Sequence, residues 1–149
     1  MSKTTRRTLY LTALALTCAA CSSGHDSKTE DRMIKALSQH RTDQVNAIDL
    51  NTILPKGWSK VCVQTAYMMQ EELEKQANIP LKHYKTMTDD ANVIMWVFYA
   101  KGNPTYMTIP RKTVMDFSSP NVIHTNCTDP QQPALFMTMI NDTKTYYFN

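Results

Sequence analysis

The chain has 149 residues, of which 42% are hydrophobic, and this composition supports one small domain with a modest core. Three of its 16 basic residues precede Cys21, which leaves 13 basic residues against 13 acidic ones in the rest of the chain. We therefore expect no nucleic-acid partner, because a basic surface is missing, and three glycines in all provide no Gly-rich phosphate-binding loop.

The first 20 residues have the layout of a signal peptide. Lys3, Arg6 and Arg7 stand before an apolar run from Leu9 to Ala20, and polar residues follow at once. The run is shorter than the ~20 residues that a membrane-spanning helix needs, and it ends in small residues, as cleavage sites do. A permanent transmembrane anchor is the alternative for this segment.

The end of the apolar run, Cys18-Ala19-Ala20-Cys21, resembles the lipobox of bacterial prolipoproteins, although Cys18 stands where that family usually has leucine. The resemblance implies that Cys21 receives diacylglycerol and, after cleavage, a further acyl chain such as palmitate. Several chains anchor a protein stably, whereas one chain does so only marginally. Ser22, in place of aspartate, implies an outer-membrane lipoprotein that faces the periplasm, if the host is Gram-negative. A redox or metal role for the C-x-x-C pair would require a folded domain around it.

Three sections are therefore expected: a signal peptide over 1–20, the lipidated cysteine with a polar tether over 21–28, and a single periplasmic domain over 29–149. Thr29 is the predicted N-cap of the first helix, which we expect to run from about Glu30 to Val45 with a patchy apolar face. Such a helix is predicted to be peripheral or to pack on a partner.

The next elements are predicted from turn residues and hydrophobic periodicity. After a turn at 55–58, the alternating segment 60–66 indicates a strand. Met69, Leu73 and Ala77 recur every four residues and predict a short helix whose stripe faces the core. Met68 is expected to fill the core as well.

The second half of the chain reads mainly as strands. Residues 93–99 are apolar on both faces and predict a central strand, and the turn at 101–104 predicts a hairpin with 105–109. A second hairpin is expected from 134–140 and 144–148, and weaker segments cover 111–117 and 121–126. The predicted fold is α+β, with a mostly antiparallel sheet of about four to five strands and two helices packed on one side.

Cys62 and Cys127 are the two cysteines that remain beyond Cys21. Two thiols in an exported domain predict a single disulfide, because the compartment is oxidising. The alternative, a reactive thiol or a metal site, lacks a C-x-x-C motif or a nearby histidine pair in this part of the sequence.

Catalytic and metal-binding motifs are weak throughout the chain. Ser118, His124 and Asp116 have the residue types of a nucleophilic triad, but no G-x-S-x-G motif surrounds a serine. Met137 and Met139 could bind Cu(I) through their thioethers, although methionine on a strand is commonly core. The four histidines lack the spacing of metal ligands: His25, His40, His83 and His124. We therefore predict neither a metal nor a cofactor.

The stretch Trp58-Ser59-Lys60-Val61-Cys62 resembles a Trp-x-x-Val-Cys pattern of small uncharacterised envelope lipoproteins. The resemblance implies no activity. In physical terms, we expect Trp58 to pack beside the disulfide and to fix the start of its strand.

The predicted function is that of a membrane-anchored cell-envelope lipoprotein with a non-enzymatic domain that binds a macromolecule, most simply an envelope protein. An immunity-type lipoprotein that blocks a toxin or phage component is one alternative. A small envelope hydrolase is the alternative from another class, and it would use Ser118, His124 and Asp116.

Overall fold

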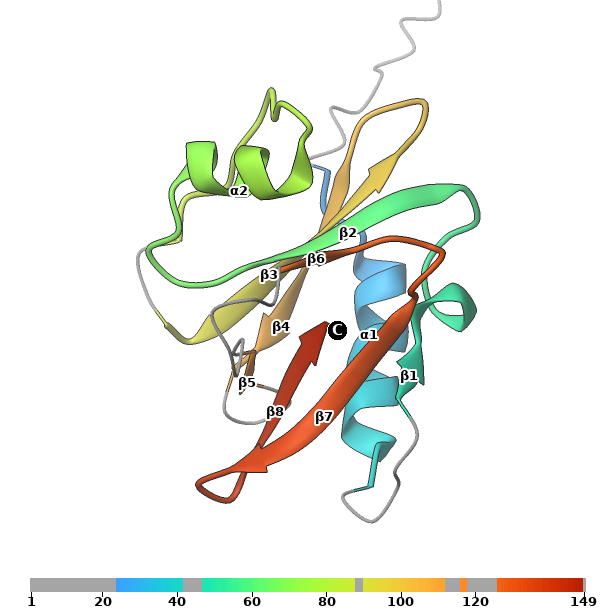
Figure 1. Ribbon diagram of the computed structural model, residues 1–149, viewed down its shortest axis with the longest axis vertical. Coiled ribbons are helices and arrows are strands. Elements are labelled where there is room, and N and C mark those ends of the chain that lie inside the picture. Colours follow the sequence, from blue (N-terminus) through green and yellow to red (C-terminus); the bar gives the residue numbers. More distant parts are fainter. Residues whose placement is uncertain (1–23, 42–46, 88–89, 112–115, 118–125, 149) are drawn as a thin grey trace, which may run out of the picture.

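A computed structural model gives the structure of the protein and describes residues 24–41, 47–87, 90–111, 116–117 and 126–148. The predicted α+β class is confirmed, with two helices and two four-stranded, mostly antiparallel sheets among these residues (Figure 1). In chain order the elements are α1 (Ser27–Gln39), β1 (Ile48–Asp49), the 3-10 helix η1 (Leu50–Thr52), β2 (Trp58–Gln64), α2 (Gln70–Ala77), β3 (Asn92–Tyr99), β4 (Thr105–Pro110), β5 (Asp116–Phe117), β6 (Cys127–Thr128), β7 (Ala134–Ile140) and β8 (Thr143–Phe148).

The first sheet has the order β4-β3-β2-β6, and each neighbouring pair in it is antiparallel. Residues 93–98 of β3 are buried on both faces, which confirms the prediction that this strand is central. The hairpin of β3 with β4 is also confirmed. We call this sheet the central sheet, because protein covers both of its faces.

The second sheet has the order β1-β7-β8-β5, and the predicted C-terminal hairpin forms its middle. Asn141 and Asp142 connect β7 to β8 with φ of 48° and 60°. Two left-handed residues in a row are what a two-residue type I′ turn requires, and asparagine and aspartate tolerate this conformation well. The turn therefore fixes the register of this hairpin.

The two helices lie on opposite faces of the central sheet, not on one side of a single sheet as predicted. Met33 and Leu37 of α1 belong to a core that includes Val61, Val63 and residues of the second sheet. Leu73 and Ala77 of α2 belong to a separate core on the other face. Because side chains alternate along a strand, two neighbouring strands that are apolar on both faces need cover on both.

Helix α1 begins three residues before its predicted start and ends at Gln39 instead of near Val45. Asp26, not Thr29, is its N-cap: its carboxylate accepts hydrogen bonds from the Thr29 amide (3.0 Å) and hydroxyl (2.7 Å). Burial alone would raise the pKa of Asp26, but these hydrogen bonds together with the nearby Arg32 and His25 lower it. Gly24 and Asp26 also pair with β4, so the predicted tether over 21–28 is too long.

The positions of Met69 and Trp58 differ from those predicted: Met69 is exposed instead of buried, and Trp58 lies on the other face of the central sheet from the disulfide. Met69 is 65% exposed, whereas Met68 is buried, because the chain is still extended at Met69 and α2 begins one residue later. Trp58 packs in the core on the α1 side and donates from Nε1 to Asn51 Oδ1 (3.1 Å). A register shift between Trp58 and Lys60 removes Trp58 from the face of Cys62.

Candidate functional site

The predicted disulfide between Cys62 and Cys127 is present, with Cα atoms 4.0 Å apart. The two cysteines face each other as cross-strand partners on β2 and β6. The tryptophan opposite Cys62 on β3 is Trp96, so this residue takes the place that the sequence suggested for Trp58. The disulfide therefore ties the short edge strand β6 to the middle of the central sheet.

Other predicted site residues are only partly described. Cys21, Ser118 and His124 lie outside the described residues. Asp116 is described, and its carboxylate accepts hydrogen bonds from Arg111 Nε (2.7 Å) and from the Phe117 amide (2.9 Å). This carboxylate is engaged by a guanidinium, which differs from the histidine partner that a triad would need.

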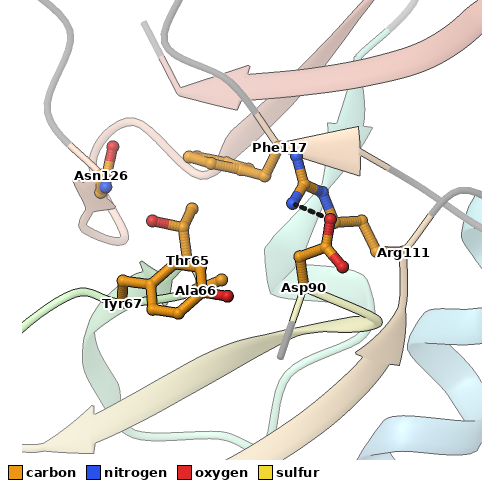
Figure 2. A pocket seen from close by; sticks show the side chains of 7 residues that line it. All are labelled: Thr65, Ala66, Tyr67, Asp90, Arg111, Phe117 and Asn126. Carbon is orange, nitrogen blue, oxygen red and sulfur yellow. Dashed lines mark ion pairs between the residues drawn. The ribbon is translucent and has the colours of Figure 1, made fainter. Parts of the chain in front are cut away.

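A pocket of about 450 Å³ opens at one end of the central sheet. Neighbouring strands of this sheet run in opposite directions, so the end of β2, the start of β3, the end of β4 and the start of β6 meet there. Figure 2 shows the ring of Phe117 facing the segment after β2, with Arg111 and Asp90 to one side and Asn126 to the other. The lining residues are Thr65, Ala66, Tyr67, Asp90, Arg111, Phe117 and Asn126.

Arg111 forms the charged wall of this pocket. Its Nε donates to Asp116, its Nη1 lies 3.7 Å from Asp90 Oδ2, and its amide donates to the Ala91 carbonyl (2.8 Å). The hydrogen bond to Asp116 raises the pKa of Arg111 above its already high usual value. Two carboxylates flank one guanidinium, so the charge of this wall does not favour an anionic ligand.

Tyr67 stands at the mouth of the pocket and is 74% exposed. Its φ of 65° places it in the left-handed region, which is an outlier for a bulky aromatic residue. The backbone on its C-terminal side is held by two hydrogen bonds: the Met68 amide donates to the Thr65 carbonyl (3.3 Å), and the Tyr84 hydroxyl donates to the Met68 carbonyl. The surrounding structure thus keeps an aromatic ring in solvent on a strained backbone.

A buried polar network supports this turn from below. Gln64 is fully buried, and its Nε2 donates to the Tyr84 hydroxyl (2.9 Å) and to the Lys85 carbonyl (2.8 Å). Its Oε1 accepts from Trp96 Nε1 (2.7 Å). Burial, together with nearby acidic side chains, raises the pKa of Tyr84, so its hydroxyl stays protonated and can donate to Met68.

Sequence reasoning missed the pocket and Tyr67. The pocket is assembled from chain segments up to 61 positions apart, between Thr65 and Asn126, and no local motif marks any of them. The one signal in the sequence was Gln64, a glutamine directly after the apolar residues 61–63. A buried amide needs partners, and here they come from the segment that carries Tyr84.

Comparison with known proteins provides no relative: no family model, no curated protein and no solved structure matches the chain. Within the described ranges, no three His, Cys, Asp or Glu side chains come together so that they could hold a metal ion. Neither α1 nor α2 has the length and apolar character that crossing a membrane would require. Function is therefore inferred from the geometry of the site.

Proposed function

We propose that the protein is a lipid-anchored envelope lipoprotein whose non-enzymatic domain binds another protein through Tyr67 and the adjoining pocket. The observation that carries this proposal is the exposure of Tyr67 on a left-handed backbone. Strained residues persist where the surrounding structure enforces them, and they cluster at functional sites. Tyrosine is also enriched among the residues that dominate the energy of protein interfaces.

The chemistry around Tyr67 favours binding over catalysis. Tyr67 and Phe117 contribute aromatic surface, whereas Thr65 and Asn126 provide uncharged hydrogen-bonding groups. Met69, two residues after Tyr67 in the sequence, is a second exposed apolar side chain. We call Tyr67, Met69 and the pocket lining the binding surface.

The position of Gly24 supports the orientation expected of an anchored binder. Gly24 pairs with Tyr106 near the start of β4, and it lies three residues after Cys21 in the sequence. Arg111, which lines the pocket, directly follows the end of the same strand. It is five residues after Tyr106, which corresponds to roughly 17 Å along an extended strand. A lipid on Cys21 would thus hold the end of the sheet that is remote from the pocket, and the binding surface would face the periplasm.

The anchor is tested by Cys21→Ser. We expect this variant to incorporate no radiolabelled palmitate and to accumulate as an uncleaved or mislocalised precursor, because the acceptor thiol is gone. Cys18→Ser is the matched control and should be labelled normally. Labelling of the Cys21→Ser protein at the level of the wild type would contradict the anchor.

The binding surface is tested by Tyr67→Gly, with Asn78→Gly as the matched control. Both residues are exposed and left-handed, with φ of 65° and 55°, so glycine relieves strain at either position and should leave the fold at least as stable. A partner is first identified by capture on the tagged wild-type lipoprotein from envelopes of its own host, and its affinity is then measured with purified components. We expect Tyr67→Gly to weaken binding by about 30-fold or more, the loss of ~2 kcal/mol at a hot spot, and Asn78→Gly to leave it unchanged.

Different outcomes of this experiment separate the alternatives. Unchanged affinity of Tyr67→Gly would contradict the proposal. A captured toxin or phage component would make the protein an immunity-type lipoprotein, which is one form of the proposed function. Loss of biological activity in Ser118→Ala, His124→Ala or Asp116→Ala, at normal abundance and with Tyr67→Gly active, would instead support the hydrolase.

A further inference from the structure

The long outer edge of the central sheet is covered by the chain itself. The Tyr106 amide donates to the Gly24 carbonyl (2.8 Å), and the Asp26 amide donates to the Tyr106 carbonyl (2.9 Å). The next outward amide of β4, that of Thr108, donates to the Glu30 carboxylate (2.6 Å). An open strand edge is a template for pairing with other chains, and here local hydrogen bonds close it.

Over the described ranges, the outer edge of β7 in the second sheet has no such cover beyond its first two residues. β1 pairs only with Ala134 and Leu135, at the start of β7. Among the described residues, no strand pairs with the remainder, Phe136 to Ile140, on that side. Figure 1 shows the β7–β8 hairpin extending away from β1 to a tip at the lower left of the view.

The backbone groups of Met137 and Met139 point toward this open edge. In a hairpin closed by a two-residue turn, the residues next to the turn, Ile140 and Thr143, form a hydrogen-bonded pair. Hydrogen-bonded and non-hydrogen-bonded pairs alternate along an antiparallel ladder. The N–H and C=O groups of Met139 and Met137 therefore face away from β8.

The side chains and composition of β7 leave this edge open to pairing. Met139 and Ile140 are 45% and 39% exposed at the hairpin tip. The strand contains no charged residue and no proline, and its pairing with β8 is continuous from Leu135 to Ile140. Charges, prolines and bulges are the features by which natural edge strands prevent association, and β7 has none of them.

We propose that two copies of the protein associate through antiparallel pairing of their β7 strands, with Met139 facing its own counterpart across a two-fold axis. β1 blocks the edge at Leu135, so the partner strand must pair near the hairpin tip. Centred on Met139, the two strands exchange N–H and C=O groups at that residue and place Ile140 opposite Thr138. This arrangement covers the exposed Met139 and Ile140 of both copies, and it brings no like charges together.

The position of Met139 on the symmetry axis provides a charge-pair test. Two differently tagged copies of the full lipoprotein are expressed together, extracted in mild detergent and purified through one tag. We expect wild-type copies to co-purify, two Met139→Lys copies to lose at least 90% of this co-purification, and Met139→Lys with Met139→Glu to recover it. Asn103→Lys, a charge at an exposed position on the turn between β3 and β4, should leave self-association unchanged.

Three outcomes would overturn the dimer: wild-type copies that do not co-purify, lysine copies that still do, or a lysine–glutamate pair that does not recover. A second readout is Met139→Cys, which should form an interchain disulfide in the oxidised envelope, because a hydrogen-bonded cross-strand pair has Cα atoms about 5.5 Å apart. Asn103→Cys, at an exposed turn outside both surfaces, should form none. Since Met139 is not part of the binding surface, its variants should bind the envelope partner normally whether or not the dimer exists.

Discussion

Replacing Cys62 and Cys127 together by alanine is expected to lower the free energy of unfolding by about 4 kcal/mol. The disulfide closes a loop between positions 65 residues apart, and in the chain-entropy model the loss of such a cross-link increases the freedom of the unfolded chain by about this amount. A loss of this size is a large fraction of the 5–15 kcal/mol that is typical of small domains. Alanine is used because Cys62 is fully buried and a serine hydroxyl there would need a partner.

Denaturant unfolding of the wild type, the wild type in reductant and the double-alanine variant measures this effect. The reduced wild type is the control, since it loses the cross-link but keeps both sulfur atoms in the core. The reduced wild type and the double-alanine variant should both unfold at a lower denaturant concentration than the oxidised wild type, and at similar concentrations to each other. A free energy of unfolding within 1 kcal/mol of the wild type in both cases would show that the disulfide contributes little to stability.

The disulfide also bears on the binding surface. Asn126, which lines the pocket, directly precedes Cys127, and its carbonyl accepts a hydrogen bond from the Val63 amide (2.7 Å). β6 consists of two residues, and among the described strands it pairs with β2, while the Asn126 amide donates to Gln76 Oε1 (3.3 Å). We therefore expect loss of the cross-link to loosen one wall of the pocket, since Asn126 lines it beside Cys127.

Elements with a strong local pattern could be predicted from the sequence. Residues 93–98 are a continuous apolar run of the length of a typical strand, and β3 is buried on both faces as expected. Asn141-Asp142 between two strand patterns predicted a tight turn, and these two residues have positive φ. The disulfide was predicted from the expected export of the chain and from the number of cysteines, without any knowledge of the fold.

Features that depend on packing between distant segments could not be predicted. The register shift after Trp58 moves this side chain to the other face of the sheet, and no residue type at that position announces it. Met68 and Met69 are chemically identical, yet only the start of α2 decides that Met69 is exposed. Tyr67 is in the left-handed region, and the neighbouring Met68 carbonyl accepts a hydrogen bond from Tyr84, which lies 17 positions later than Tyr67. The candidate site is thus a product of tertiary structure.

Gln64→Leu is expected to lower the free energy of unfolding by about 3 kcal/mol. Leucine has a similar volume but cannot accept the hydrogen bond from Trp96 Nε1, and it leaves the Lys85 carbonyl and the Tyr84 hydroxyl without the amide. Each buried polar group that loses its partner costs ~1–3 kcal/mol, and groups in one network depend on one another. Gln131→Leu, on an exposed turn, is the matched control and should change stability by at most ~0.5 kcal/mol.

A double-mutant cycle with Trp96→Phe shows whether the network acts as a unit. Phenylalanine removes the orphaned indole donor, so the double variant should be less destabilised than the sum of the single variants, by at least ~1 kcal/mol. Additive losses would mean that Gln64 and Trp96 contribute independently.

Gln64→Leu should also weaken partner binding at temperatures where the protein remains folded. Gln64 hydrogen-bonds to the Tyr84 hydroxyl, which in turn hydrogen-bonds to the backbone next to Tyr67. Full stability with unchanged binding would exclude a role of the network in positioning Tyr67.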